Sequence, residues 1–360
     1  MQRPVAYRSE QLDMRPPSTS VGIARKCGKW RELPYLRDNE GMLPPCMIAV
    51  GDRRRVASGA KLLREPVLLH EALEKVVGTH GRGRVDVAVG IFEHEGKPLP
   101  VTLLETGVGC SAQELYGLEG LLLSRHDGYL LDGIKLPATE IVILRVGMCR
   151  GIIIGEGDHQ KEPPFIRPGD MIITECSLDD GLVARQRLGL GSSMDISTMR
   201  RFWDAWTTGL GLRVSEDNRW PVLDSTPAVV TALMKSCSAL GLERHLGSNL
   251  SKASINLEQH AEELVRLRKK HNVLSTEMDH FCLALLAHEL TRQGIATSNG
   301  LVSCVAGTVP GTSHPEQGSL EENALLRKET GMMHAALLAL WEIFYGKNSN
   351  PGRSSGSIPP

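Results

Sequence analysis

The sequence predicts a single α/β domain, and two observations carry this prediction. Short apolar runs of strand length alternate with longer amphipathic segments between about residues 31 and 345, and no clear linker divides this stretch. Residues 1–30 are polar and contain prolines, so we expect a loosely ordered extension there. Residues 346–360 are expected to form a low-complexity tail of Gly, Ser, Pro and Asn.

The predicted elements follow from apolar runs and the turn signals between them. The strand CMIAV (46–50) leads straight into GDRRRV, and a helical stretch follows through Leu63. Two alternating apolar runs flank Glu95 and Gly96, which predicts a β-hairpin. The run EIVILRVG (140–147) predicts a buried strand. The other predicted elements are a helix opened by the capping-box residues Ser111 and Glu114, a strand at 170–176, a helix from Thr226 to Gly241, helices at 257–271 and 277–294, a strand at 301–309, and a last helix opened by Ser319 and Glu322 and interrupted at Gly331.

The composition argues against several classes of protein. The formal net charge is −1 and both signs are interspersed, so nucleic acid is not expected as a main partner. The eight cysteines form no CxxC pair and most lie in apolar runs, which is typical of buried thiols in a reducing compartment. The N-terminus lacks the apolar segment of a secretory signal, and no apolar run has the length of a membrane span. We therefore expect a cytosolic protein that does not bind membranes, and we find no metal-binding pattern.

Polar residues mark three places in the predicted α/β domain, two at strands and one at the start of a late helix, and in open α/β sheets ligands collect beyond the carboxyl ends of the strands. Gly51 comes straight after the first strand and is followed by three arginines ending at Arg55, a pattern that suits an anion but also suits a solvated turn. Arg145 interrupts an apolar strand, which is costly unless an anion or a partner carboxylate meets it. Glu277 and Asp279 precede a late helix, where they could bind sugar hydroxyls or simply favour the helix N-terminus.

The order of these motifs resembles that of the nucleoside phosphorylase family, which contains uridine phosphorylase and the hexameric purine nucleoside phosphorylases. A strand followed by GDxxR comes first, then a hairpin followed by Thr106–Gly107–Val108–Gly109, a strand carrying RxG at Arg145, and Glu277–Met278–Asp279 opening a late helix. The phrase FIRPGDMIITE (165–175) is also similar to the family's sequence. The resemblance covers roughly residues 33 to 345.

This resemblance implies a fold, a reaction and an assembly. The fold would be one domain with a central mixed sheet flanked by helices. The reaction would be attack of inorganic phosphate on the anomeric carbon of a nucleoside, which releases the base and ribose 1-phosphate without an organic cofactor. The family forms dimers, or hexamers made of dimers, so a homo-oligomer is implied. The nucleoside and phosphate would be the only small-molecule partners.

The resemblance also assigns roles to individual residues. Gly51, Arg55 and Arg145 correspond to the phosphate clamp, and the two arginines would be the catalytic groups. Thr106 belongs to the loop that lines the floor of the phosphate and ribose sites. Met148 stands where the family has a hydroxyl residue, so only its backbone N–H can reach phosphate.

Further positions correspond to the sugar and base sites. Glu277, Met278 and Asp279 would bind the ribose, with aspartate at 279 where the family usually has glutamate. Tyr35 stands where a neighbouring subunit's histidine meets the sugar 5′-hydroxyl. Gln259 would read a pyrimidine base, because its amide offers a donor and an acceptor.

Two further positions bear on the identity of the base. The late strand LVSCVAGTV (301–309) carries Ala306 and Gly307 where the purine enzymes have a catalytic aspartate, which favours a pyrimidine nucleoside, uridine first. Ala261 replaces an arginine of the base site.

Arg150 leaves two readings open. It replaces a small glycine, and it either supplies the donor lost at Ala261 or fills the pocket together with Met148. The second reading describes a catalytically silent homologue that serves as a partner subunit. A nucleosidase, or a phosphorylase for another base, also remains open.

Overall fold

A computed structural model describes fifteen stretches of the chain: 43–68, 86–109, 112–113, 117, 129–131, 134–136, 140–156, 159–160, 163–179, 208–209, 211–215, 220–252, 261–292, 294–309 and 322–346. The predicted extension at 1–30, the tail after Gly346, Tyr35 and Gln259 lie outside these residues, as does the capping box at Ser111 and Glu114.

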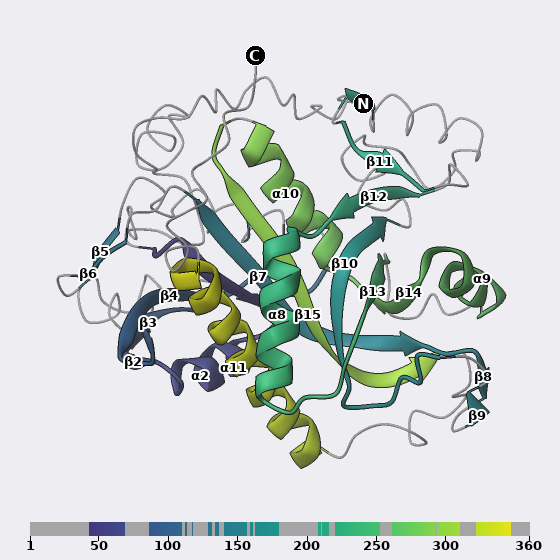
Figure 1. The fold of residues 1–360 in the computed structure, drawn as a ribbon, viewed down its shortest axis with the longest axis horizontal. Coiled ribbons are helices and arrows are strands. Elements are labelled where there is room, and N and C mark those ends of the chain that lie inside the picture. Colours follow the sequence, from purple (N-terminus) through teal and green to yellow (C-terminus); the bar gives the residue numbers. More distant parts are fainter. Residues whose placement is uncertain are drawn as a thin grey trace, which may run out of the picture.

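A mixed eleven-stranded β-sheet forms the centre of the molecule, with the strand order β11-β12-β10-β13-β14-β7-β1-β4-β3-β2 and β15 pairing with both β10 and β7 (Figure 1). The first strand, β1, is paired in parallel with β4 on one side and β7 on the other. Two short hairpins, β5–β6 and β8–β9, lie outside this sheet. The strands are β1 (Cys46–Val50), β2 (Arg64–Leu68), β3 (Val87–His94), β4 (Lys97–Glu105), β5 (Tyr129–Leu131), β6 (Ile134–Leu136), β7 (Ile141–Ile152), β8 (Gly155–Glu156), β9 (His159–Gln160), β10 (Met171–Asp179), β11 (Arg213–Val214), β12 (Pro221–Asp224), β13 (Arg244–Ser251), β14 (Val273–Glu277) and β15 (Thr297–Val309).

Part of the sheet closes on itself. Because β15 pairs with both β7 and β10, the strands β7, β15, β10, β13 and β14 form a hydrogen-bonded ring. A small apolar cluster draws residues from four of these strands, as the interior of a small barrel requires. Its members on the strands are Cys149, Ile172, Leu274 and Val305.

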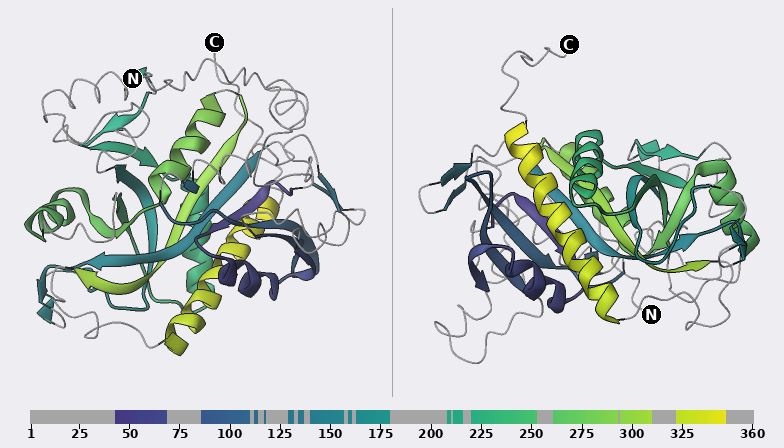
Figure 2. Two further views of the ribbon diagram at one scale, coloured as in Figure 1. Left: turned by 180° about the vertical axis from the view of Figure 1, so that it is seen from behind. Right: turned by 60° about the horizontal axis from the view of Figure 1, so that its bottom comes forward.

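Helices cover both faces of the open sheet (Figures 1 and 2). The larger apolar cluster packs α2, α8 and α11 against one face, where alternate residues of β1 and β7 point, including Ile48, Leu144 and Val146. The helix α10 lies against β15, β10 and β12, and α9 packs on β14 and β7. The helices are α2 (Arg53–Ala60), α8 (Pro227–Ala239), α9 (Ala261–His271), α10 (His280–Arg292) and α11 (Glu322–Gly346).

The predicted single α/β domain with a mixed sheet and flanking helices is confirmed, and most elements lie where the sequence placed them. The hairpin β3–β4 turns at Glu95 and Gly96, which both have positive φ. The strand β7 is longer than the predicted 140–147, because β15 and β14 pair with residues beyond Gly147.

One predicted break is wrong. The helix α11 continues through Gly331, where the sequence suggested an interruption. A Cβ at this position would lie 3.3 Å from Leu242, so the glycine allows α11 to pack closely against the loop after α8. Within the described ranges, no helix is both long and apolar enough to cross a membrane.

Candidate functional site

The site begins where β1 ends. Asp52 caps α2 by accepting a hydrogen bond from the backbone N–H of Arg55 at 3.2 Å. Thr106, which follows β4, binds the carbonyl of Val50 through both its N–H, at 2.8 Å, and its hydroxyl, at 3.1 Å. These bonds hold the glycine loop after β4 beside the start of α2. In that loop Gly107 and Gly109 have φ of 72° and 92°, a region that favours glycine.

Arg145 is the largest fully buried side chain in the described part of the protein. Its Nη2 donates to the Asp279 carboxylate and, at 3.4 Å, to the carbonyl of Gly107. Its Nε and Nη1 are also buried but have no hydrogen-bond partner among the described residues. Burying a guanidinium with two unsatisfied donors is costly, so this site favours a further acceptor.

A second guanidinium approaches the first at Gly51. A Cβ placed on Gly51 would lie 3.2 Å from Nη2 of Arg145, 3.3 Å from Nη1 of Arg55 and 3.3 Å from Cγ2 of Val108. The two cationic groups therefore converge on one point that only a glycine leaves open. At Gly147, two residues after Arg145, a Cβ would lie 3.9 Å from Nε, which is an ordinary van der Waals contact, so space there does not require a glycine. Converging arginine donors of this kind match an oxyanion such as phosphate.

Arg55 is held from the other side by α11. Its Nε and Nη2 both donate to Oε1 of Glu329, at 3.0 and 2.7 Å. Its Nη1 lies 3.5 Å from Oδ2 of Asp52. The side chains of Arg55 and Glu329 are only 13% and 17% exposed, so this ion pair is shielded from water far more than a surface pair.

Asp279 links the buried arginine to the glycine loop. One carboxylate oxygen accepts from Nη2 of Arg145, and the other accepts from the backbone N–H of Gly109. The Cε atom of Met278 would lie 4.0 Å from a Cβ on Gly109, so the methionine side chain reaches the same loop. A carboxylate offers about four acceptor positions, and described residues of the chain occupy two of those of Asp279.

Glu277 is occupied by donors of the chain itself. Oε1 accepts from Asn249 Nδ2 at 2.6 Å and from the Ser251 hydroxyl, while Oε2 accepts from the backbone N–H groups of Asp279 and His280 at 2.5 and 2.9 Å. Burial raises the pKa of this carboxyl and the Asp279 carboxylate acts in the same direction, while the hydrogen bonds lower it. Four described donors surround this carboxyl, and two of them are backbone N–H groups at the start of α10, so Glu277 fixes the entry into this helix.

The comparisons with known proteins bear on the fold. No protein-family model matches the sequence, and no curated protein matches it. Among solved structures, purine nucleoside phosphorylase from Toxoplasma gondii in complex with immucillin-H superposes with a TM-score of 0.53 and 16% identity, over 87% of this chain and 97% of that one. A uridine phosphorylase of the oomycete Phytophthora capsici gives a TM-score of 0.53 and 16% identity, over 84% and 91% of the two chains. The chain has the nucleoside phosphorylase fold. At this identity, the likeness covers the fold alone.

His280, the first residue of α10, is fully buried. Its Nδ1 lies 2.7 Å from the Ser177 hydroxyl, and its Nε2 is buried without a partner in the described ranges. Burial, with a further contribution from the charge of Arg145, lowers the pKa of His280 to about 3. The imidazole is therefore neutral near pH 7 and adds no charge beside Arg145.

The structure brings some predicted site residues together and leaves others apart. Gly51, Arg55, Arg145, Met278 and Asp279 meet around the glycine loop. Met148 instead packs against the cluster on the α8 and α11 face, so its side chain is directed away from Arg145. Arg150 has the same parity along β7 as Met148 and is paired with Thr276 and Gly307, which puts it on the face opposite Arg145. Ala306 and Gly307 are half-buried, and β15 contains no acidic residue.

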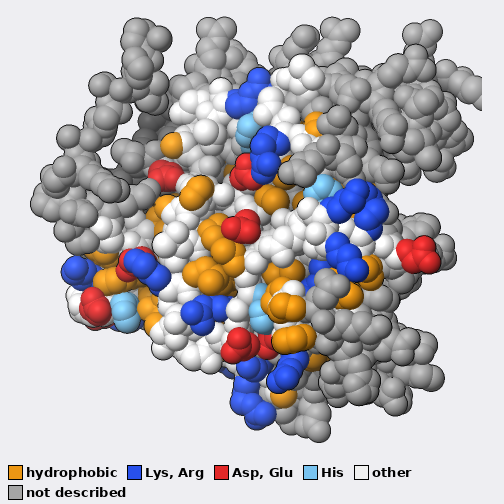
Figure 3. Space-filling view, turned by 45° about the vertical axis from the view of Figure 1, so that its right-hand side comes forward, with side chains coloured by type: hydrophobic (Ala, Val, Ile, Leu, Met, Phe, Trp, Pro, Cys, Tyr) orange, Lys and Arg blue, Asp and Glu red, His pale blue; other side chains and the backbone are white. Residues whose placement is uncertain are grey.

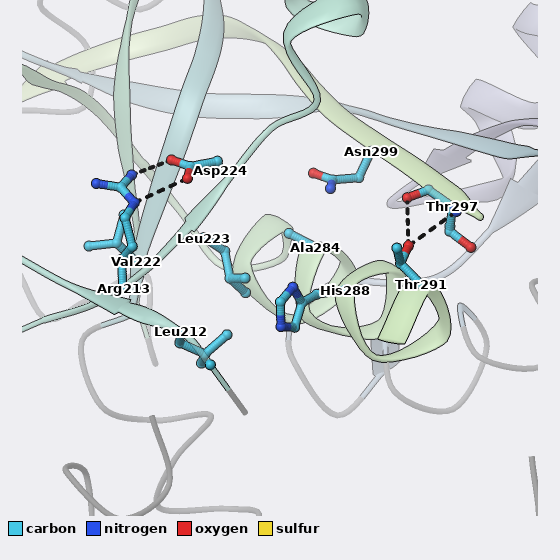
Figure 4. Close-up of a pocket in the computed structure, with 11 residues that line it drawn as sticks. Leu212, Arg213, Val222, Leu223, Asp224, Ala284, His288, Thr291, Thr297 and Asn299 are labelled. Carbon is cyan, nitrogen blue, oxygen red and sulfur yellow. Dashed lines mark hydrogen bonds and ion pairs between the residues drawn. The ribbon is translucent and has the colours of Figure 1, made fainter. Parts of the chain in front are cut away.

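A separate pocket of about 250 Å³ lies between α10, the β11–β12 hairpin and the start of β15 (Figure 4). The ion pair of Arg213 with Asp224 borders it, and the amide of Asn299 points into it. His288, also in its lining, is two helical turns beyond His280, so this pocket is distinct from the arginine pair. The described residues contain no group of three or more side chains placed to hold a metal. On the face shown in Figure 3, acidic and basic side chains are mixed among apolar ones.

Proposed function

We propose that the chain is a nucleoside phosphorylase for a pyrimidine ribonucleoside, with uridine as the first substrate to test. The reaction converts the nucleoside and inorganic phosphate to the free base and ribose 1-phosphate. The observation that carries this proposal is the pair of guanidinium groups that meet at Gly51, one of them buried with two donors unsatisfied. A phosphate dianion supplies the missing acceptors. Related nucleosidases use water as the nucleophile and need no such pair of arginines.

The chemistry requires placement more than new functional groups. A phosphate oxygen bonds to the anomeric carbon as the glycosidic C–N bond breaks, the electron pair leaves with the base, and the proton of hydrogen phosphate ends on the base. The transition state has oxocarbenium character, so an anion held beside the sugar stabilises it. Arg55 and Arg145 hold that anion in this proposal.

Asp279 is the sugar-binding group in this proposal. It contacts Arg145 directly, so its two unused acceptor positions are next to the proposed phosphate site. The ribose 2′- and 3′-hydroxyls would donate to these positions. Because its other two positions are fixed by Arg145 and Gly109, the carboxylate is preorganised for the sugar. Glu277 positions this segment in the proposal, because it accepts from the backbone N–H groups of Asp279 and His280.

The choice of a pyrimidine rests on the sequence. Gln259, which lies outside the described residues, is proposed to pair with the O2 and N3 edge of the base, and the acid of the purine enzymes has no counterpart in β15. The proposal needs no organic cofactor. It includes a homodimer or hexamer in the cytoplasm.

A second candidate is a catalytically silent subunit that pairs with an active homologue. Met148 favours it, because a side chain packed in the core replaces a hydroxyl that would contact phosphate in the family. Copurification with an active homologue, without turnover by the purified chain, supports this candidate.

The decisive test is release of uracil from uridine by the purified protein, with and without inorganic phosphate. We expect release only with phosphate, and its loss in Arg145→Met. The matched control is Arg213→Met, which removes an arginine that is 60% exposed and also paired with an aspartate. Turnover that ignores phosphate would point to a nucleosidase. If no base is released from any nucleoside of a panel, the result would favour the catalytically silent subunit.

A further inference from the structure

The carboxylate of Glu329 controls the direction of the Arg55 guanidinium. The two residues are 274 positions apart in sequence, and α11 brings the carboxylate to the start of α2. Two of the three guanidinium nitrogens, Nε and Nη2, bind a single oxygen of Glu329. Only Nη1 remains directed toward Gly51 and Arg145.

A second carboxylate, that of Asp52, competes for the Arg55 guanidinium and could change its direction. Oδ2 of Asp52 lies 3.5 Å from Nη1 of Arg55, and Asp52 is fixed as the cap of α2. Without a partner for Nε and Nη2, the long arginine side chain can rotate toward Asp52 or toward solvent. Glu329 prevents that rotation, because satisfying Nε and Nη2 together fixes the plane of the guanidinium.

The helix that carries Glu329 is itself firmly attached. Near its C-terminal end, Trp341 donates from Nε1 to the carbonyl of Lys97 at 3.2 Å, and its ring meets His94 edge-on at 4.8 Å. The Lys97 ammonium lies 5.7 Å from the centre of that ring, and the Tyr345 hydroxyl donates to the carbonyl of Pro98 at 2.5 Å. The β3–β4 hairpin thus holds α11 in place, which keeps Glu329 at a fixed distance from Gly51.

We propose that Glu329 is a positioning residue for the anion site, and that its two hydrogen bonds present Nη1 of Arg55 to bound phosphate. This inference rests on the proposed function, since it takes phosphate as the ligand. The role needs an acceptor oxygen rather than a negative charge, because both hydrogen bonds end on the same oxygen. A glutamine can supply that oxygen.

The test measures binding of inorganic phosphate by calorimetry, without nucleoside, to the full-length protein and its variants. Glu329→Ala is expected to raise the Kd for phosphate about tenfold, a change that corresponds to one lost charge-assisted contact. Glu329→Gln is expected to bind within about threefold of the unchanged protein. The control Glu342→Ala removes another carboxylate of α11, which pairs with Lys235 at 3.0 Å, and should leave the Kd unchanged. In steady-state assays the KM for phosphate should rise in Glu329→Ala, while the KM for the nucleoside stays constant.

Three outcomes distinguish the role of Glu329 from the proposed phosphate clamp of Arg55 and Arg145. Unchanged phosphate binding in Glu329→Ala, with binding lost in Arg55→Ala, would overturn the role of Glu329 and leave the phosphate clamp standing. Equal loss in Glu329→Gln and Glu329→Ala would overturn the hydrogen-bond account. If Arg55→Ala and Arg145→Met bind phosphate as tightly as the unchanged protein, the clamp itself fails. Melting temperatures of all variants, measured in parallel, keep a loss of folding from being read as a loss of binding.

Discussion

Gly51 shows how much of the site depends on one missing side chain. The residue lies between two guanidinium groups and the side chain of Val108, and all three would be within 3.3 Å of an added methyl group. Contacts this short force the neighbours to move by a few tenths of an ångström. Two of these neighbours are the guanidinium groups proposed to hold phosphate, so their movement would weaken phosphate binding.

We therefore predict that Gly51→Ala weakens phosphate binding about tenfold and changes the free energy of unfolding by less than about 1 kcal/mol. Calorimetry with inorganic phosphate and chemical denaturation would check the two parts. Gly209→Ala is the matched control, because no atom lies within 4 Å of its added Cβ. Full phosphate affinity in Gly51→Ala would contradict the placement of the anion between the two arginines.

Glu277 gives a prediction about pH. Burial raises its pKa above the ordinary value of 4.5, so the stability contributed by its protonated form is fully present below that pH and is lost as pH rises through the folded-state pKa. Glutamine cannot ionise, and its amide nitrogen would face the backbone N–H groups of Asp279 and His280. Glu277→Gln is expected to be less stable by about 1–3 kcal/mol at low pH. The difference in the free energy of unfolding between the unchanged protein and Glu277→Gln should become smaller as pH rises, which urea denaturation between pH 4.5 and 8 would measure. A difference that grows with pH would contradict this prediction, because it would show that the four hydrogen bonds lower the pKa of Glu277 more than burial raises it.

At the residue scale, the sequence could predict only part of this site. Arg145 was recognisable because a charged residue inside an apolar strand needs a partner, and Gly51 and Asp279 followed from the order of motifs. Glu329 was not recognisable, since it is one of several charged residues on α11 and nothing local marks its partner. The role of Glu277 was left between a sugar ligand and a helix terminus, and its four donors come from the strand β13 and from the start of α10, which no local pattern reveals.

At the element scale, the length of the strand β7 decides on which side of the sheet the side chains of Met148 and Arg150 lie. The sequence predicted that this strand ends at Gly147. Pairing with β14 and β15 extends it to Ile152 instead. Within an extended strand, alternation decides the face, and both residues lie on the face opposite Arg145. Long-range pairing of this kind depends on partners more than 100 residues away.

The helix α11 supports a prediction at the element scale. Trp341 is 8% exposed and combines a hydrogen bond, an edge-on ring contact and a cation–π contact with the β3–β4 hairpin. Trp341→Ala should lower the free energy of unfolding by about 3–5 kcal/mol, as for other large aromatic truncations. Trp341→Phe retains a ring but loses the indole N–H, so a loss of about 1 kcal/mol is expected. Denaturation curves would measure the free energy of unfolding of both variants. Equal losses in Trp341→Ala and Trp341→Phe would show that the indole hydrogen bond, rather than the ring, accounts for the stabilisation.

At the scale of the whole molecule, the sequence predicted the α/β class but not the closure of the sheet. The alternation of strands and helices was visible in the sequence, whereas the pairing of β15 with both β7 and β10 was not, because an apolar strand carries no mark of its neighbours. The resemblance implies an oligomer, and the described chain does not test it. Light scattering during gel filtration should give the mass of a dimer or a hexamer, and a monomer at micromolar concentration would contradict that expectation.

The ring of strands has a consequence for the exchange of backbone hydrogens with solvent. Residues 302–304 of β15 have strands on both sides, since they pair with β7 and with β10. Opening the β15 backbone there requires the ring to separate, so local fraying cannot expose it. These amides should exchange with deuterium only through global unfolding, while those of β2, an exposed strand at the end of the sheet, exchange through local opening. Arg145 pairs with Leu301 on the adjacent strand, so the described amides expected to exchange only through global unfolding lie directly beside the arginine that the proposed site depends on.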